Sequence, residues 1–555
     1  MNKAVFGSFT ILCLLSISSI PVLIHVVRAD GGTVFIRADG SIDPQTAPIY
    51  TADNITYTLT GNITADDDGI VIERDNTVLN GAGYTVMGNG SGNGIDLINR
   101  NNVTIKNTNI ENFDYGAYLE NSSNKTTSGN NVANNSGGIR LDYSVNNSVS
   151  GNNITANYRH GIRLDYSINN SVGGNNLTAN GGDGVYLYYS VNNSVSRNNV
   201  VNNGGGIGLD YSVNNSVSGN NLTANYGDGI TLGSSSNNSV SGNNITANNA
   251  YGVHIDSSSN SSVSGNNIKA NNWNGIRLDS SSNSSVSGNN ITANNVYGVG
   301  LYSSSNSSIS GNNIANNGYG VGLDFGSNDN NISANNITAN NGHGVGLFSS
   351  SSNSIFHNNL VNNNVQVYST SDSANIWDYA YPSGGNYWSD YNGTDLKTGP
   401  CQNRTGSDGI GDTPYIIDSS NKDNFPLMGT FSDFNAPSKY HVQTICNSTI
   451  SDFQFNGTAI SLNAAGKNGT NGFCRISLPA APINGTFTVS VNGTDVPYTL
   501  LPESNNTQSY LYFTYHHSTQ EATIPEFPSS IILPLFLTAT LLTAMIYKKR
   551  PTRTT

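Results

Sequence analysis

The middle of the chain repeats one sequence with a nearly fixed period. The unit Gly138-Ile-Arg-Leu-Asp-Tyr-Ser-Val-Asn-Asn-Ser-Val-Ser-Gly-Asn-Asn-Ile-Thr-Ala-Asn recurs at intervals of 22 to 24 residues as far as Asn364. Later copies begin at Gly161, Gly184, Gly206, Gly229, Gly252, Gly275, Gly298, Gly320 and Gly344. A period of this length is typical of solenoids, in which every copy forms one coil of a continuous stack.

Within a coil the apolar residues are few and stand two positions apart, as Ile139 and Leu141 do. This alternation predicts short strands, because a helix would need a period of 3.6. The remaining positions are mostly Gly, Asn and Ser, which favour tight turns. A leucine-rich repeat is similar in length, but it needs several leucines and a helical segment per unit. The repeat therefore predicts an all-β chain built on a right-handed parallel β-helix, with identical Asn residues stacked in ladders.

Weaker copies extend the array toward the N-terminus, beginning at Gly69, Gly94 and Gly116. Counting from Gly69 to Gly344 predicts about thirteen coils, and at about 4.8 Å per coil the rod should be roughly 60 Å long. We expect residues 69–364 to form the β-helix and residues 30–68 to cap its open N-terminal end.

After the last copy the composition changes twice. Residues 365–434 are rich in aromatic and acidic residues, and we expect them to cap the other end of the rod. Residues 435–520 contain alternating strand-like runs separated by Asn-Gly pairs, which predicts a small antiparallel β-sandwich.

Both ends of the chain carry apolar segments. Residues 1–29 are predicted to be a secretory signal, although the apolar run is long enough for a permanent membrane helix to be the alternative. Residues 521–530 form a predicted linker, residues 531–547 a transmembrane helix, and residues 548–555 a basic cytoplasmic tail. Everything between would then lie on the extracellular face of the membrane, anchored by the C-terminal segment.

An extracellular location permits disulfides and glycans. Cys13 would leave with the signal, and of the three pairings among the other cysteines we prefer Cys446 with Cys474, which leaves Cys401 unpaired. Asn-x-Ser/Thr sequons are frequent because a repeat of Asn and Ser produces them automatically. Sequons outside the repeat are therefore the better glycosylation candidates, among them Asn447, Asn456 and Asn484.

The charge of the chain limits the kind of molecule that it is expected to bind. Charged residues make up 11% of the chain and the formal net charge is −13, which argues against a nucleic acid partner.

Two columns of outward side chains follow the first strand of each coil. One contains Arg140, Arg163, Tyr186, Thr231, His254 and Arg277; the second contains Asp142, Asp165, Tyr188, Asp210, Asp256, Asp279, Tyr302 and Asp324. Arg140, Arg163, Tyr186, Tyr188, His254 and Arg277 are candidates for binding sugar rings and hydroxyl groups.

Carboxylates one coil apart approach the separation used by retaining glycosidases. The catalytic candidates are therefore Asp142, Asp165, Asp256 and Asp279. The alternative is that Arg and Asp neutralise each other on a solvated face. Gly208, Gly300, Gly322 and Gly346 interrupt the columns, whereas an active site should break the repeat with unique residues.

The densest acidic cluster lies in the C-terminal cap and contains Asp408, Asp412, Asp418 and Asp423. Two interpretations stand side by side. The carboxylates and bent carbonyls could hold a structural Ca²⁺, although the spacing is not that of an EF-hand. Alternatively, the aspartates cap their own turns.

The repeats, the C-terminal cap and the C-terminal tail each resemble sequences of known families. The repeats resemble the right-handed parallel β-helix proteins of NosD type, described as periplasmic copper-binding, and more broadly the carbohydrate-binding and sugar-hydrolase β-helix superfamily. Gly385-Asn-Tyr-Trp-Ser-Asp-Tyr, Asp408-Gly-Ile-Gly-Asp-Thr-Pro-Tyr and Asp423-Asn-Phe-Pro-Leu-Met are similar to the C-terminal signature of archaeal surface members. Pro525-Glu-Phe resembles the archaeal PEF-type sorting signal. Copper sites favour Cys, Met and clustered His, and the few such residues here form no ligand set.

These observations predict a surface-anchored protein with a carbohydrate-binding, adhesion or structural role in the envelope, and a polysaccharide or surface glycan as its partner. The alternative is an extracellular polysaccharide lyase or hydrolase that acts on the Asp-lined face. Copper delivery is a third, less favoured interpretation.

Overall fold

The computed structural model describes residues 31–370, 373–436, 440–456, 459–479, 487–517 and 521–525, the last of these by its backbone alone. The predicted signal segment, transmembrane segment and basic tail, together with Asn484 and Phe527 of the sorting motif, lie outside these residues. The described residues form strands and no helix, so none of their elements is a helix able to cross a membrane.

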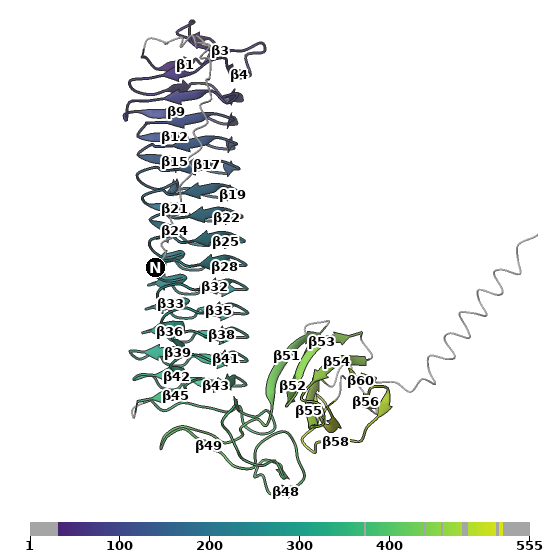
Figure 1. The fold of residues 1–555 in the computed structure, drawn as a ribbon. Coiled ribbons are helices and arrows are strands. Elements are labelled where there is room, and N and C mark those ends of the chain that lie inside the picture. Colours follow the sequence, from purple (N-terminus) through teal and green to yellow (C-terminus); the bar gives the residue numbers. More distant parts are fainter. Residues whose placement is uncertain are drawn as a thin grey trace, which may run out of the picture.

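A rod of three long sheets makes up most of the structure (Figure 1). Every coil contributes one strand to each sheet, and strands of successive coils pair in parallel. We call the sheets A, B and C. Sheet B runs from β4 (Thr56–Leu59) to β43 (Ser354–Phe356), and sheet C runs from β5 (Ile63–Thr64) to β44 (Asn359–Val361) and ends on β46 (Tyr387–Trp388).

Sheet A carries the candidate site described below. Its parallel strands are β1 (Val34–Ile36), β6 (Ile70–Ile72), β9 (Asn93–Ile98), β12 (Tyr115–Glu120), β15 (Gly137–Asp142), β18 (Ile162–Asp165), β21 (Asp183–Tyr188), β24 (Gly205–Asp210), β27 (Ile230–Gly233), β30 (Val253–Asp256), β33 (Ile276–Asp279), β36 (Tyr297–Tyr302), β39 (Tyr319–Asp324), β42 (His343–Leu347) and β45 (Val365–Ser369).

The parallel β-helix expected from the repeat is confirmed, but the rod has about 14 coils where we predicted thirteen. The additional coil is formed by β1, β4 and β5, whose sequence lacks the recurring Asn and Ser of the later copies. Antiparallel strands β2 (Ile42–Asp43) and β3 (Ile49–Tyr50) then cover the free edges of sheets A and B. An uncovered edge would invite pairing with another chain.

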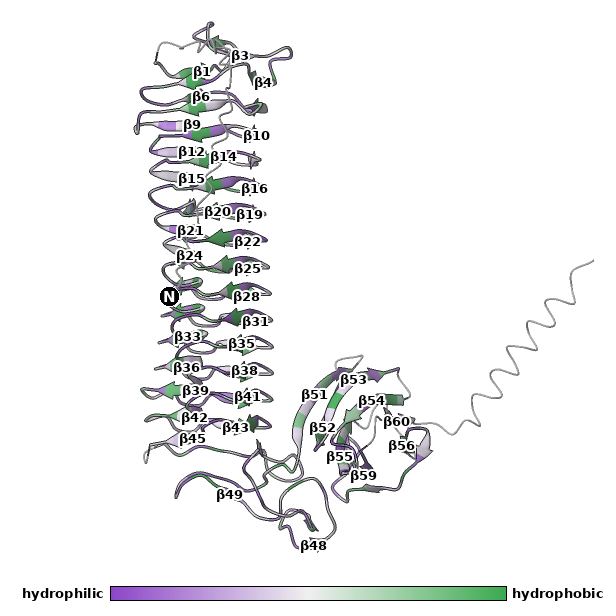
Figure 2. Ribbon diagram, viewed as in Figure 1, coloured by the Kyte–Doolittle hydropathy of each residue, from purple (hydrophilic) through white to green (hydrophobic). Residues whose placement is uncertain are grey.

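The inside of the rod is a continuous column of aliphatic side chains. Each coil contributes about four, as Ile139, Leu141, Val149 and Ile154 do, and all four are at most 1% exposed. Figure 2 shows the hydrophobic residue at the centre of short strands such as β22 (Ser194–Ser196) and β25 (Ser216–Ser218). One coil could not bury these side chains by itself, so the stack depends on its neighbours.

Buried asparagine ladders hold the corners between the sheets. At Asn243 the side-chain oxygen accepts from the backbone N–H and the amide of Asn220 at 2.9 and 3.0 Å. Its amide donates to the carbonyl of Val217 and to the side-chain oxygen of Asn266, at 3.0 and 2.9 Å. The predicted ladders are thus confirmed, and they satisfy backbone groups that no sheet reaches.

Two tryptophans close the C-terminal end of the core. Trp377 and Trp388 are 1% exposed, and their ring centroids lie 5.8 Å apart. The indole N–H of Trp377 donates to Asn421, and that of Trp388 donates to Asp423. The aromatic residues after the repeat therefore cover apolar surface that would otherwise meet water.

The C-terminal unit consists of two five-stranded antiparallel sheets whose buried residues share one core. The first contains β51 (Thr430–Ala436), β52 (Tyr440–Cys446), β55 (Asn471–Pro479), β59 (Gln508–His516) and β58 (Tyr498–Leu500); the second contains β53 (Thr449–Phe455), β54 (Ala459–Ala465), β60 (Glu521–Pro525), β56 (Ser490–Val491) and β57 (Thr494–Asp495). Cys446 and Cys474 face each other on β52 and β55 and form the preferred disulfide, while Cys401 is free and exposed.

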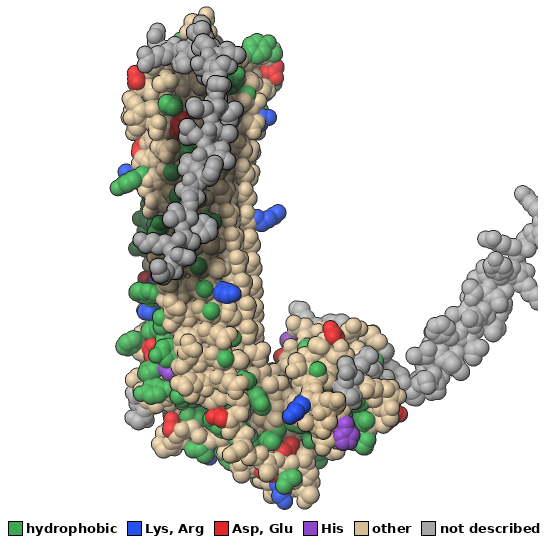
Figure 3. Space-filling model, viewed as in Figure 1, with side chains coloured by type: hydrophobic (Ala, Val, Ile, Leu, Met, Phe, Trp, Pro, Cys, Tyr) green, Lys and Arg blue, Asp and Glu red, His purple; other side chains and the backbone are tan. Residues whose placement is uncertain are grey.

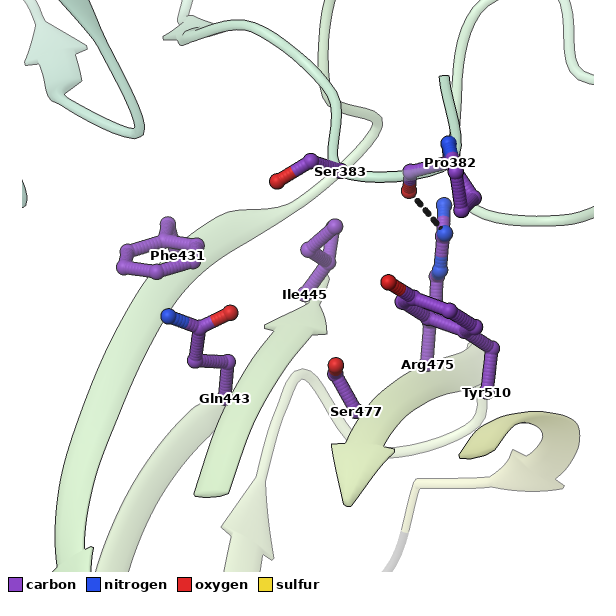
Figure 4. A pocket seen from close by; sticks show the side chains of 8 residues that line it. All are labelled: Pro382, Ser383, Phe431, Gln443, Ile445, Arg475, Ser477 and Tyr510. Atoms are coloured by element: carbon purple, nitrogen blue, oxygen red, sulfur yellow. Dashed lines mark hydrogen bonds between the residues drawn. The ribbon is translucent and has the colours of Figure 1, made fainter. Parts of the chain in front are cut away.

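A buried arginine joins this unit to the cap. Arg475 on β55 is 2% exposed, and its guanidinium donates to the carbonyl of Pro382 (Figure 4). It also donates to the carbonyl of Asp408 at 3.3 Å. Asn359 at the last coil accepts from the backbone N–H of Phe431 at 2.7 Å and donates to its carbonyl at 2.9 Å. The junction therefore rests on specific polar contacts as well as on apolar packing.

Candidate carbohydrate-binding face

Sheet A differs from the other two sheets in the side chains that it turns outward. Sheet B presents mainly Ser, as at Ser148 and Ser150, and sheet C presents mainly Asn and Thr, as at Asn153 and Thr155. Sheet A presents Arg, Asp, Tyr, His and Phe. Because the three sheets share one backbone architecture, this difference in chemistry marks sheet A as the candidate site.

The register brings the predicted columns together. Arg140 lies beside Arg163, and Asp142 lies beside Asp165, each pair one coil apart. Farther along, His254 is beside Arg277 and Asp256 is beside Asp279. The sequence spacing therefore placed these side chains correctly, although it did not show what each of them contacts.

The first catalytic candidates are engaged by arginine. Arg140 contacts Asp142 at 2.9 Å and Asp165 at 3.0 Å, and Arg163 contacts Asp165 at 2.9 Å. Both carboxyl groups are buried. This arrangement agrees with mutual neutralisation of Arg and Asp, which was the alternative to catalysis.

A second engaged group surrounds His254. Its Nδ1 lies 3.3 Å from a carboxylate oxygen of Asp228, and its Nε2 lies 3.0 Å from one of Asp279. Burial lowers the pKa of His254, but the two carboxylates outweigh burial and leave the pKa raised. Arg277 also contacts Asp279, at 2.9 Å, whereas Asp256 is exposed and accepts from the hydroxyl of Ser257 at 3.1 Å.

Between these groups the repeat is broken by glycine. The carboxyl group of Asp183 on β21 lies over Gly205 and Gly208 of the next coil, where a Cβ on either glycine would clash with it. Burial, together with the smaller effect of the charges of Asp210 and Asp228, raises the pKa of Asp183 to about 7. We call Asp183, Asp210 and Asp228 the acidic strip.

Tyr186 and Tyr188 flank the acidic strip. The hydroxyl of Tyr186 donates to Asp210 at 2.7 Å, and its ring stacks on His160 with centroids 4.5 Å apart. Tyr188 packs edge-on against Tyr189 at 4.6 Å. Of these two ligand candidates, Tyr186 therefore has a partly covered ring, and Tyr188 lies near the edge of the sheet.

Sequence reasoning missed a stack of four exposed tyrosines along that edge. Successive ring centroids are 4.9 to 5.2 Å apart and the ring planes are nearly parallel. The stack, called here the tyrosine corner, contains Tyr143, Tyr166, Tyr189 and Tyr211. The recurrence of Tyr directly after the Leu-Asp or Leu-Tyr pair of successive copies was the signal that could have revealed it.

Sequence reasoning also missed an aromatic surface over the last coils of sheet A. Its centroid distances are 5.1 Å from Tyr297 to Tyr319, 4.5 Å from Tyr319 to His343, 5.8 Å from His343 to Phe348, and 5.2 Å from Phe348 to Tyr368. We call these five residues the aromatic floor. Figure 3 shows hydrophobic side chains along the left edge of this part of the rod, beside the strands labelled β33 to β45 in Figure 1.

Glycines create the space for the aromatic floor. A Cβ on Gly322 would clash with the ring of Tyr297, and one on Gly346 would clash with His343. We had regarded such glycines as interruptions of the columns. In the structure they let rings from the neighbouring column lie down on the sheet, because a residue without Cβ leaves the backbone accessible.

The four acidic residues proposed for calcium, called here the cap aspartates, act separately in the structure. Asp408 accepts from the hydroxyls of Tyr381 and Thr398, and Asp412 accepts from the backbone N–H groups of Leu396 and Lys397. Asp418 accepts from the backbone N–H groups of Ser420 and Asn421. Asp423 accepts from the backbone N–H groups of Asn386 and Phe425 and from the indole N–H of Trp388. Among the described residues no three His, Cys, Asp or Glu side chains are grouped to hold a metal ion. Calcium at these positions stays a prediction.

The two described glycosylation candidates lie in the C-terminal unit and are exposed. The side chain of Asn447 bridges two residues of β55, donating to the carbonyl of Asn471 at 3.1 Å and accepting from Phe473 at 2.8 Å. The oxygen of Asn456 accepts from the N–H of Ala459 at 2.8 Å. Glycosylation at either position stays a prediction.

Solved structures with a similar fold share little sequence with this chain. A double mutant of the periplasmic alginate epimerase AlgG is 17% identical, with 62% of this chain and 84% of that chain covered and a TM-score of 0.35. The surface adhesin PfbA of Streptococcus pneumoniae is 13% identical, covering 52% and 84%, with a TM-score of 0.33. The A-module of the mannuronan C-5 epimerase AlgE6 of Azotobacter vinelandii is 17% identical, covering 63% and 91%, with a TM-score of 0.29.

The family comparison is more specific than these structural likenesses. A search of curated proteins found no match. The family model described as "Periplasmic copper-binding protein (NosD)" matches residues 60–227 and 223–393, which together span more than half of the chain and nearly all of the rod. The chain therefore belongs to the NosD family of parallel β-helix proteins.

Proposed function

We propose that this protein binds carbohydrate at the cell surface through the outer face of sheet A. The observation that carries the proposal is the concentration of aromatic and charged side chains on one of three otherwise equivalent sheets. Sugar-binding surfaces need flat apolar contacts for ring faces and polar groups for hydroxyls. Sheet A supplies both along a rigid rod, which suits an adhesive or structural role in the envelope.

The proposed placement at the surface rests on the ends of the chain. A secretory signal at residues 1–29 and an anchor at residues 531–547, preceded by an archaeal PEF-type sorting signal, would hold the rod outside the membrane. The C-terminal unit would then be a small β-sandwich between rod and anchor. In that location, Asn447, Asn456 and Asn484 are the proposed glycan carriers.

Binding measurements on a panel of polysaccharides test this function. The full-length protein in detergent should bind at least one neutral or acidic polymer in affinity electrophoresis. A combined loss of exposed rings, Tyr319→Ala with Tyr368→Ala, should weaken that binding while leaving the circular dichroism spectrum unchanged. Absence of binding to every polymer of the panel would overturn the proposal.

A second candidate function, polysaccharide lysis or hydrolysis, is favoured by the acidic strip. Asp183, whose pKa is raised to about 7 mainly by burial, can keep a proton near neutral pH, and Asp228 accepts from the hydroxyl of Thr231 and lies 3.3 Å from His254. A carboxyl group that keeps its proton beside a second carboxyl group is typical of acid and base pairs. Release of new chain ends by the wild-type protein, abolished in Asp183→Asn, would establish catalysis. Binding without any release of chain ends would leave the non-enzymatic function.

The family's description implies copper, which can be tested against the side chains present. Copper binds soft sulfur and clustered imidazole ligands. His160 accepts from the N–H of Asp183, His254 lies between two aspartates, and the Cys446 sulfur is in a disulfide. The described residues thus do not assemble a copper ligand set, and no step of the proposed function passes through copper.

A further inference from the structure

We propose that the aromatic floor is the main binding site, and that its ligand is a neutral polysaccharide, without carboxylate or sulfate groups. This inference rests on the proposed carbohydrate-binding function and specifies its site and ligand class. Two independent observations carry it: the geometry of the rings and the absence of positive charge from this part of the chain.

The rings form a surface that runs along the rod. Tyr297, Tyr319 and His343 follow one another on β36, β39 and β42, one per coil. On β45 this position is taken by Val365, and Tyr368, which pairs with Gly346, brings its ring within 5.9 Å of His343. Tyr319 is 37% and Tyr368 is 49% exposed, so both rings are available to a ligand. Tyr297 is 8% exposed and supports the other rings from below, so a polymer lying along the rod would meet one ring per coil, about every 4.8 Å, from β39 to β45.

Glycine keeps this surface low. At Gly300, Gly322 and Gly346 the repeat lacks the outward side chain that Arg140 and Arg163 supply on earlier coils. Neighbouring rings occupy that space instead, as the clash of a Cβ at Gly322 with Tyr297 shows. The low surface lets a sugar ring approach from above, whereas a projecting arginine would obstruct it.

The charge around the aromatic floor disfavours an anionic polymer. No Lys or Arg occurs in the sequence between Arg277 and Lys397. Arg277 itself is paired with Asp279 and stacked on the ring of Tyr302 at 3.8 Å. Burial lowers the pKa of His343, which disfavours a positive charge on this imidazole.

The remaining charge on these strands is negative. Among the described residues of β36, β39, β42 and β45, the one charged side chain is Asp324. The acidic strip lies farther along the same face. The carboxylates of Asp324 and of the acidic strip would therefore repel a polyuronate, and no cation on these strands would compensate. A neutral polysaccharide would not be repelled.

Binding measurements with two polymers of matched length test the inference. The full-length protein should bind a neutral β-glucan, and a polyuronate such as alginate should bind at least tenfold more weakly. Tyr368→Ala should weaken glucan binding by about tenfold, corresponding to 1.4 kcal/mol, and Tyr368→Phe should retain it because the ring is kept. Gly322→Ala should also weaken binding, because it displaces Tyr297 without removing any ring.

Tyr143→Ala is the matched control, since Tyr143 is a similarly exposed ring (55%) on the tyrosine corner. This variant should bind the glucan as the wild type does. Stronger binding of alginate than of glucan would overturn the inference but leave carbohydrate binding standing. Glucan binding lost in Tyr143→Ala and kept in Tyr368→Ala would overturn the location. Failure to bind either polymer would refute the underlying function, so the two failures are distinguishable. Melting temperatures of all variants report whether they fold.

Discussion

Replacing Asn243 by alanine should destabilise the rod far more than the same change at its neighbour Asn244. Asn243 is 1% exposed, and its side chain takes part in four hydrogen bonds, two donated and two accepted. At about 1 kcal/mol for each bond, the loss is about 4 kcal/mol. Much of this cost arises because the backbone N–H of Asn220 would stay buried without an acceptor, and its side-chain amide would keep the carbonyl of Val195 but lose its second acceptor.

Asn244 is a matched control because it also belongs to a ladder. Its amide donates to Asn221 at 2.8 Å and its oxygen accepts from Asn267 at 2.8 Å, but the side chain is exposed on sheet C. Water replaces both partners in Asn244→Ala, so we expect a loss of at most about 1 kcal/mol.

Urea unfolding and hydrogen exchange together measure the difference. Long repeat arrays do not always unfold in one step, so the midpoint has to be read with the slope of the transition. In Asn243→Ala, hydrogen exchange should accelerate at the backbone N–H of Asn220, because this group loses its acceptor. Equal urea midpoints for Asn243→Ala and Asn244→Ala, or an unchanged exchange rate at the backbone N–H of Asn220, would refute the idea that the buried asparagine ladders hold the coils together.

Three further predictions concern polar side chains with several hydrogen-bond partners or with strong burial. Arg475→Ala should lower the free energy of unfolding by about 3 kcal/mol, because the carbonyls of Pro382 and Asp408 lose a charged donor. A thermal shift of the C-terminal unit measures this loss. An unchanged melting temperature would contradict the role of this arginine at the junction. Asp183 has a pKa of about 7 in the folded protein and an ordinary value of 3.8, so its contribution to stability is full below about pH 4 and is lost as pH rises through 7. Asp183→Asn should flatten this part of the curve of melting temperature against pH, and an identical curve would show that the carboxyl is ionised throughout. Chelation by EGTA should lower the melting temperature by several degrees where the cap aspartates hold the predicted Ca²⁺, whereas an unchanged melting temperature would leave these carboxylates as acceptors for nearby N–H and O–H donors only.

The rod could be predicted from the sequence because every coil repeats the same local choices. Alternating aliphatic residues such as Ile139 and Leu141 specify an inner face, and Gly, Asn and Ser specify the corners. Stacking then follows from the inability of one coil to bury its own apolar side chains. The first coil escaped prediction because residues 34–64 lack the recurring pattern while forming the same three strands.

The candidate site was only partly predictable. A fixed period determined which residues share a column, so Arg140 and Arg163 were correctly placed side by side. It could not determine where a long side chain leans. Tyr297 lies over Gly322 of the next coil, and that contact depends on side-chain torsion and on the missing Cβ of a residue in another copy.

Sequence alone thus determined the solenoid, its polar corners and the columns on each face, because these follow from local periodicity. Tertiary structure decided which side chains of sheet A are engaged by opposite charges and which stay open as an aromatic surface. The physical reason is that ion pairing and ring packing act through space between coils, at distances that a one-dimensional pattern does not contain.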